Sequence, residues 1–145
     1  MKSVAMEPTI ASGSVINLDR NAYLSDLPKR WDIVGFKKSG GTEVWIFRIL
    51  GMPNETISIT DDSVKVNGKF LTYPDFGNII KYLPPYKVVG SPEKSKFKIY
   101  RVPTDSYFLV GDNSKVANDS RFSGSVHISN ILGKVILMGS SRTPN

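Results

Sequence analysis

The sequence predicts a mostly β fold of antiparallel sheets with little helix, and two observations carry this prediction. The chain of 145 residues contains many short runs rich in Val, Ile, Phe, Tyr and Trp, each bounded by turn residues. No long segment repeats its apolar residues with the period of a helix. The length and a hydrophobic content of 40% predict one globular domain over residues 1–145.

The strands are expected where these runs occur along the chain. They are Ser14–Leu18, Asp32–Lys37, Thr42–Leu50, Thr56–Ile59, Ser63–Val66, Lys96–Val102, Tyr107–Val110 and Gly133–Met138. Asn67-Gly68 predicts a two-residue hairpin turn, because both residues tolerate the positive φ that such a turn requires. At most one helical turn is expected, near Leu24 to Leu27.

An irregular insert is predicted over about residues 73–95, where four prolines and three tyrosines gather. The run from Tyr82 to Tyr86 within it is interpreted as a semi-rigid surface loop. A polyproline-type ligand or an aromatic contact patch is the alternative interpretation of the same run.

Composition excludes several classes of chemistry. The chain has no Cys and one His, so cysteine nucleophiles, disulfide frameworks and multi-histidine metal sites are ruled out. We expect neither a metal nor a cofactor. No apolar run approaches the roughly 20 residues that cross a bilayer. With 19 Lys and Arg against 13 Asp and Glu, the charge of +6 suits an anionic membrane surface or a nucleic acid.

Three segments stand out when they are taken together. They are Ser-Val-Ala-Met-Glu-Pro-Thr-Ile at residues 3–10, Asp-Ile-Val-Gly-Phe-Lys at 32–37 with Phe-Arg-Ile-Leu-Gly-Met-Pro at 47–53, and Gly-Asp-Asn at 111–113 with Asn-Asp-Ser-Arg-Phe-Ser-Gly at 118–124. Each alone is an ordinary turn or loop. In this order and spacing they resemble the bacterial type I signal peptidases, membrane-anchored endopeptidases that use a Ser/Lys dyad. The resemblance covers nearly the whole chain and implies a signal-peptidase-like β fold.

The departures from the family pattern fall on its reactive residues. Ala5 stands at the position of the nucleophilic serine, and Phe47 at that of the general-base lysine. Ala117 stands where the family usually has a serine that orients this lysine. Alanine has no oxygen with which to form an acyl-enzyme, and phenylalanine cannot accept a proton.

Strand alternation gives the change at Phe47 a physical interpretation. In a regular strand Trp45, Phe47 and Ile49 share one face, so Phe47 is expected among apolar neighbours. Such surroundings would lower the pKa of a lysine and make it a base. With Phe47 in its place, the same position is expected to become core.

Other positions match the family pattern. Ser3 corresponds to the serine that helps to form the oxyanion hole, and Met6 and Pro8 to residues beside the substrate. The remaining matches are expected to hold the site together, with a structural ion pair between Asp119 and Arg121. They are Arg48, Gly111, Asp112, Asn113, Ala117, Asp119, Ser120 and Arg121.

The resulting hypothesis is a signal peptidase homologue that does not cleave and acts in the binding or assembly of exported proteins. One alternative is an active signal peptidase in which Ala replaces the nucleophilic Ser, which would explain Ala5 but neither Phe47 nor Ala117. A second alternative is a basic β domain that binds nucleic acid, which the resemblance makes unexpected.

The resemblance also implies a setting and partners. The domain is expected on the outer face of the bacterial cytoplasmic membrane, with its transmembrane anchor absent from this chain. Expected partners are signal peptides, exported or pilus proteins, and the membrane surface. An apolar surface beside the site could also drive self-association of the soluble chain.

Overall fold

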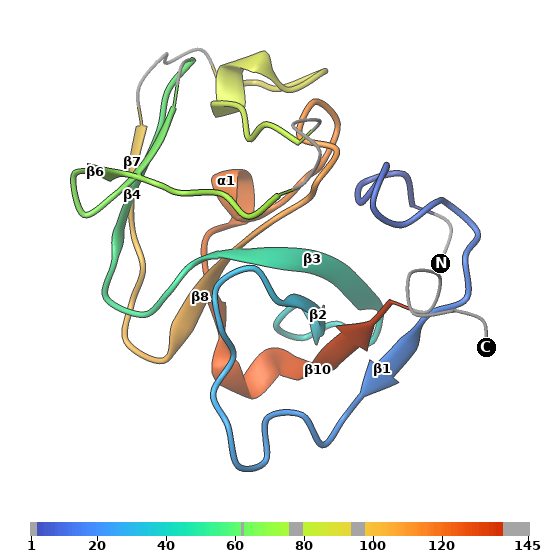
Figure 1. Ribbon diagram of the computed structural model, residues 1–145. Coiled ribbons are helices and arrows are strands. Elements are labelled where there is room, and N and C mark those ends of the chain that lie inside the picture. The colour runs from blue at the N-terminus through green and yellow to red at the C-terminus, as the bar shows by residue number, and fades with distance from the viewer. Residues whose placement is uncertain (1–2, 62, 76–79, 94–97, 138–145) are drawn as a thin grey trace.

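The computed structural model describes residues 3–61, 63–75, 80–93 and 98–137, which form two antiparallel sheets (Figure 1). The larger sheet has the order β1 (Asn17–Asp19), β10 (Ile131–Ile136), β2 (Ile33–Lys37), β3 (Val44–Gly51), β8 (Ser106–Val110) and β9 (Val126–His127). The smaller has the order β6 (Lys69–Phe70), β5 (Val64–Val66), β4 (Thr56–Ile59) and β7 (Lys98–Arg101). The prediction of a mostly β fold is confirmed.

Strand β3 connects the two halves of the larger sheet. Its first part pairs with β2, from Val44 opposite Lys37 to Arg48 opposite Ile33. Its last part pairs with β8, beginning where Arg48 lies opposite Val110. Among the residues that the structure describes, no strand pairs with the other edge of Val44 to Phe47. This stretch of backbone edge borders the site described below.

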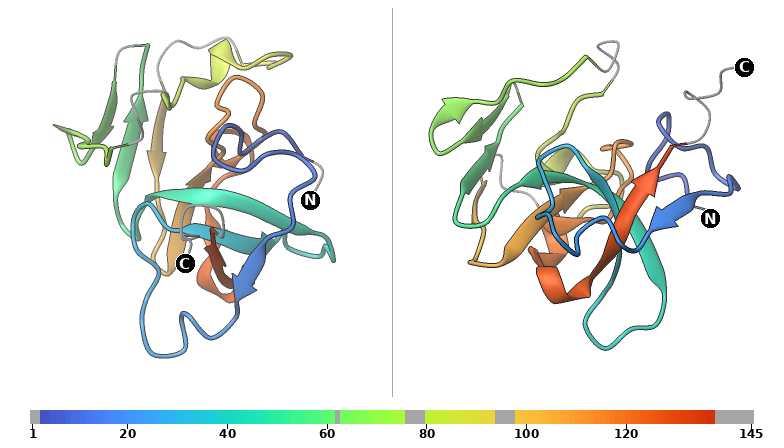
Figure 2. Two further views of the ribbon diagram at one scale, coloured as in Figure 1. Left: turned by 45° about the vertical axis from the view of Figure 1, so that its right-hand side comes forward. Right: turned by 60° about the horizontal axis from the view of Figure 1, so that its bottom comes forward.

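Each sheet encloses an apolar core, and Figure 2 shows the two sheets from two further directions. The core of the larger sheet includes Val34, Phe47 and Leu109. The core beside the smaller sheet includes Leu50, Ile57 and Phe108. Because β3 and β8 contribute to both cores, the side chains of β8 and those of β3 from Ile46 onward are buried on both faces.

Most of the predicted strands are found within a few residues of their expected bounds. The Asn67-Gly68 turn is confirmed, with φ of 52° and 83° at its two residues, between β5 and β6. The predicted strand Ser14–Leu18 is displaced to β1. Met138 and Lys96 to Phe97, at the ends of two predicted strands, lie outside the described residues.

The helical turn expected near Leu24 to Leu27 is wrong. Leu24 and Leu27 are 78% and 69% exposed. A helix here would therefore bury no apolar face against the rest of the protein, and such burial is what stabilises most short helices. The α-helix α1 (Ser120–Ser123) lies after β8 instead, and Asp119 caps it by accepting a hydrogen bond from the Arg121 backbone N–H at 3.1 Å. A 3₁₀ turn, η2 (Ile128–Asn130), precedes β10.

The insert contains a 3₁₀ turn, η1 (Pro85–Lys87), in its described part, while residues 76–79, 94 and 95 lie outside that part. The interpretation of its Tyr82–Tyr86 run as a surface loop is wrong. Tyr82 is 1% exposed, and its ring stacks on Tyr73 with 5.7 Å between the ring centroids. The insert lies close to α1 (Figure 1). Burial of Tyr82 makes this segment part of the core.

Candidate active site

The N-terminal segment is held against the loop that follows β8. The backbone N–H of Asn113 donates to the Ala5 carbonyl at 2.9 Å, and its side-chain amide donates to the Val4 carbonyl at 3.1 Å. The N–H of Asp112 donates to the Met6 sulfur at 3.4 Å, and Met6 is fully buried. These contacts bring the first and third of the sequence segments together.

Gly111 marks the point where Ala5, Phe47 and Ala117 meet. A Cβ atom at Gly111 would lie 2.5 Å from the Cβ of Ala117 and 2.7 Å from the carbonyl oxygen of Ala5. It would also lie 3.4 Å from the Cε1 of Phe47. Residues 5, 47 and 117, far apart in the sequence, therefore surround one backbone position, and glycine is the residue that fits there.

Phe47 is part of the apolar core at this point. It is 2% exposed, and its ring centroid lies 5.8 Å from that of Phe36 and 6.4 Å from that of Trp45. Ala117 is fully buried beside it. The groups around Gly111 are thus a methyl, a ring and a backbone carbonyl, none of which can attack a carbonyl carbon or accept a proton from a nucleophile.

Ser3 is exposed, and its hydroxyl oxygen accepts a hydrogen bond from the Ala5 N–H at 3.0 Å. These are the two groups that would form an oxyanion hole by the family resemblance. Here they bond to each other. A peptide carbonyl that approached this point would have to displace the Ser3 hydroxyl.

A pocket of about 460 Å³ lies beside the unpaired edge of β3. Its described lining consists of Ser3, Met6, Glu43, Val44, Trp45, Ile46 and Phe47. Pro8, which the resemblance places near substrate, is exposed and is not among these lining residues. The pocket wall is predominantly apolar, with Ser3 and Glu43 as its polar side chains.

Asp112 and Arg48 form a buried ion pair. The Asp112 carboxylate accepts from Arg48 Nε at 2.9 Å and from Nη2 at 2.7 Å. It also accepts from the hydroxyls of Tyr82 at 2.7 Å and Thr9 at 2.5 Å. Burial lowers the pKa of Arg48, but the bonds and charge of Asp112 outweigh it, so this pKa is raised. One carboxylate thereby joins the N-terminal segment, β3 and the insert.

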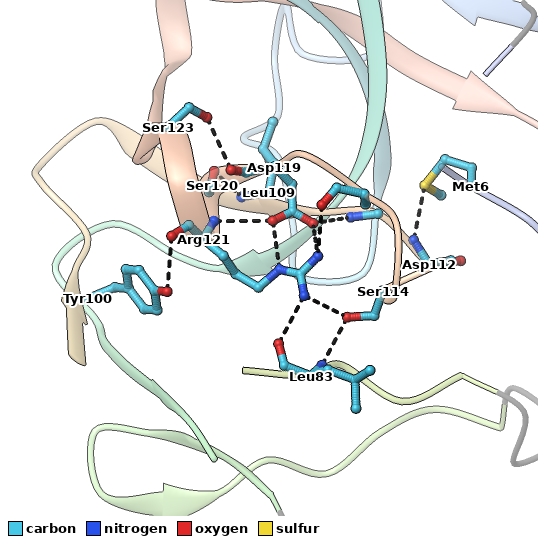
Figure 3. A network of polar contacts seen from close by, with 12 residues as sticks. Met6, Leu83, Tyr100, Leu109, Asp112, Ser114, Asp119, Ser120, Arg121 and Ser123 are labelled. Atoms are coloured by element: carbon cyan, nitrogen blue, oxygen red, sulfur yellow. Dashed lines mark hydrogen bonds and ion pairs between the residues drawn. The ribbon is translucent and has the colours of Figure 1, made fainter. Parts of the chain in front are cut away.

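Arg121 forms a second buried network, which Figure 3 shows around its guanidinium group. Nε donates to Asp119 at 2.8 Å, and both side chains are fully buried. Nη1 donates to the Leu83 carbonyl and to the Ser114 hydroxyl, each at 2.9 Å. Nη2 donates to the Ala117 carbonyl at 3.2 Å. Arg121 thus ties the insert to the loop that carries Ala117.

The partners of this network support β8. The Asp119 carboxylate accepts from the Gly111 N–H, and the Ser120 hydroxyl accepts from the Leu109 N–H, both at 2.9 Å. The first bond satisfies a backbone group just beyond the end of β8 and fixes the position of Gly111, and the second satisfies a backbone group within β8.

Sequence reasoning did not find Tyr82, Thr9 or Ser114 as members of these networks. Tyr82 lies in the insert, where the sequence gives no partner for its hydroxyl. Thr9 and Ser114 directly follow the matched positions Pro8 and Asn113, and this proximity is the signal that could have drawn attention to them.

Within the described ranges, no group of three or more Asp, Glu or His side chains could hold a metal ion. Among the same residues, no helix is long and apolar enough to cross a membrane.

Comparison with known proteins decides the family. A family model described as "Signal peptidase, peptidase S26" matches residues 1–139. The chain belongs to this signal peptidase family. It is 33% identical over 141 residues to "Signal peptidase I V" of Bacillus subtilis, covering 93% of this chain and 80% of that protein.

Further signal peptidase relatives agree with this assignment. "Signal peptidase I" of Leptolyngbya laminosa is 31% identical over 143 residues, which cover 93% of this chain and 64% of that protein. The crystal structure of a signal peptidase I from Enterococcus faecalis matches with a TM-score of 0.53 and 25% identity, covering 75% of this chain and 97% of that one. The family and its fold are thereby established for this chain.

Proposed function

We propose that this chain is a signal peptidase homologue that does not cleave peptides and that binds exported or pilus proteins at the membrane. The observation that carries the proposal is the convergence of Ala5, Phe47 and Ala117 around Gly111. By the family resemblance, these positions would hold the nucleophile, the base and the residue that orients the base. All of them carry side chains without a reactive group.

The packing of Phe47 favours this proposal over an active enzyme in which only the nucleophile was replaced. Phe47 packs against Phe36 and Trp45, and Ala117 is fully buried beside Gly111. A replacement made to trap substrate would need Ala5 alone. The surroundings of Phe47 are those of a core residue. The apolar character of the site therefore extends to the packing around Phe47 and is not confined to residue 5.

The unpaired edge of β3 supports a binding role. The N–H of Ile49 donates to the Asp32 carbonyl at 2.8 Å, on the side that faces β2. Because backbone groups alternate along a strand, those of Val44 and Ile46 point to the opposite side, toward the unpaired edge. An extended peptide can add there as a strand, with its main chain bonded to β3 and its side chains directed at the pocket.

Exposed aliphatic residues beside the site support a contact with the membrane surface. Val4, Val89 and Val116 are 46%, 74% and 42% exposed. Two hydrogen bonds place these valines in one region. The Asn113 side-chain amide donates to the Val4 carbonyl, and the Val89 N–H donates to the carbonyl of Lys115, which precedes Val116. The net charge of the whole chain, +6, also suits contact with the outer face of an anionic bacterial membrane.

The proposal is tested by incubating the protein with a peptide that carries small residues at the first and third positions before the scissile bond. We expect no cleavage by the unmodified chain and none by Ala5→Ser, because a serine without a base is not activated. Ala5→Ser combined with Phe47→Lys restores both members of the dyad, and only this variant is expected to cleave, at a trace rate. Cleavage by the unmodified chain would overturn the proposal.

A further inference from the structure

We propose that the pocket beside β3 selects an extended peptide that carries two features. One is a bulky apolar side chain, and the other is a Lys or Arg two positions before or after it. The inference rests on the proposed function and names the class of peptide that the same site binds. It differs from the small side chains that the family resemblance implies.

The size of the pocket is the first argument. Its volume of about 460 Å³ exceeds the roughly 150 Å³ of a cavity that holds benzene. A methyl side chain would leave most of the pocket wall without contacting atoms, and the dispersion energy of those contacts would be lost. A leucine or phenylalanine side chain fills more of the space and removes more apolar surface from water.

The chemistry of the wall is the second argument. Phe47 stands in the wall at the position of a lysine in the family pattern, and the small part of it that is exposed is apolar. Its neighbours in the wall are Trp45, Met6 and Ile46, all of them apolar. Aromatic and thioether side chains adapt well to large aliphatic or aromatic partners.

Charge supplies the third argument. Glu43 directly precedes β3, and among the described lining residues it is the one with a charge. Lys38 lies nearby, with its ammonium 4.1 Å from the centroid of the Trp45 ring, but it does not line the pocket. Among the described residues Glu43 forms no ion pair with Lys38, so its carboxylate is available to a basic residue of the peptide.

Strand geometry gives the spacing. Side chains two residues apart on a strand share a face and lie about 6–7 Å from each other. Glu43 is two residues before Trp45 and four before Phe47. A strand added along β3 that puts its bulky residue beside Trp45 therefore has its next residue on that face within reach of Glu43.

The test measures the affinity of labelled extended peptides by fluorescence polarisation. One set differs only at a central residue, which is Ala, Leu or Phe. A second set keeps Leu and carries either Lys or the uncharged norleucine two positions away. We expect the Leu and Phe peptides to bind at least about ten-fold more tightly than the Ala peptide, and Lys to bind more tightly than norleucine.

Two variants and a matched control locate the effect. Trp45→Ala removes part of the wall and is expected to reduce the preference for Leu over Ala. Glu43→Gln is expected to abolish the preference for Lys while keeping that for Leu. Phe70→Ala is the control, because Phe70 is 72% exposed on β6 of the other sheet, and this variant should bind every peptide as the parent does.

The outcomes separate this inference from the proposed function. Equal or tighter binding of the Ala peptide overturns the inference and leaves the proposed function standing. Cleavage of any peptide overturns the proposed function, whatever the order of affinities. If the protein instead sediments as a dimer and binds no peptide, a second copy occupies the groove and the inference is wrong.

Discussion

Arg48 on β3 and Asp112 after β8 form a buried ion pair that joins three distant parts of the chain. The Asp112 side chain is fully buried, and the Arg48 side chain is 9% exposed. Arg48 also donates to the Trp31 carbonyl at 2.9 Å. A buried charge without its partner is costly, so this pair makes the N-terminal segment, β3 and the insert depend on one another.

Asp112→Asn is therefore expected to lower the free energy of unfolding by about 3–5 kcal/mol, because the Arg48 charge stays buried without a counter-charge. Urea denaturation measures this loss. Glu93→Gln is the matched control, since Glu93 pairs with Lys98 at 3.3 Å near the surface and its loss should cost no more than about 1 kcal/mol. Equal losses in the two variants would contradict the dependence on the Arg48–Asp112 pair.

Gly111→Ala is expected to destabilise the protein by about 1–3 kcal/mol, because the added methyl would overlap Ala117 and the Ala5 carbonyl. Combining it with Ala117→Gly removes the contact at 2.5 Å but keeps the one at 2.7 Å, so we expect partial recovery. Thermal unfolding of both variants checks this. No recovery at all, or full recovery, would show that residues 5, 111 and 117 are not packed as described.

Phe47→Lys is expected to be unstable at neutral pH, because it places an ammonium in the core. Burial would lower the pKa of this lysine below its ordinary value of about 10.4. The unfolded state then binds more protons between the two pKa values, so stability rises as the pH rises toward about 10. Phe47→Leu is the control and should show the pH profile of the parent. A flat profile for the lysine variant would mean that position 47 is open to solvent.

Acid should weaken the protein partly through Glu55. Burial raises the pKa of Glu55, but its bonds to Arg30 at 2.7 and 2.8 Å and to the Met52 N–H at 2.7 Å outweigh burial and lower it. A lowered pKa gives stability that is present above the unfolded value of about 4.3 and is lost as the pH falls through the folded value.

Glu55→Gln is thus expected to reduce stability by about 1–2 kcal/mol at neutral pH and to flatten the decline in acid. Denaturation midpoints measured between about pH 6 and pH 3 test this expectation. Arg30→Met removes the partner and should flatten the same part of the profile. If the stability of both variants falls as steeply with decreasing pH as that of the parent, the Arg30–Glu55 pair does not contribute to acid sensitivity.

Local patterns were sufficient to predict the strands and the hairpin. Alternating β-branched and aromatic residues select extended backbone, and the Asn67-Gly68 turn needs no distant contact to form. The predicted position of the helix was wrong for two reasons. The helix α1 is short and depends on Asp119 as its cap, and Leu24 and Leu27 are exposed, so no packing surface stabilises a helix there.

The sequence by itself determined the family and the mostly β fold, and it placed Ala, Phe and Ala at residues 5, 47 and 117, since these follow from residue identity and local pattern. Only the tertiary structure decided that these positions meet at Gly111, that Tyr82 is buried against Asp112, and that no described strand pairs with the β3 edge beside the apolar pocket. The reason is physical. Packing and buried hydrogen bonds join residues that lie far apart along the chain, and the local propensity of each residue does not predict such contacts.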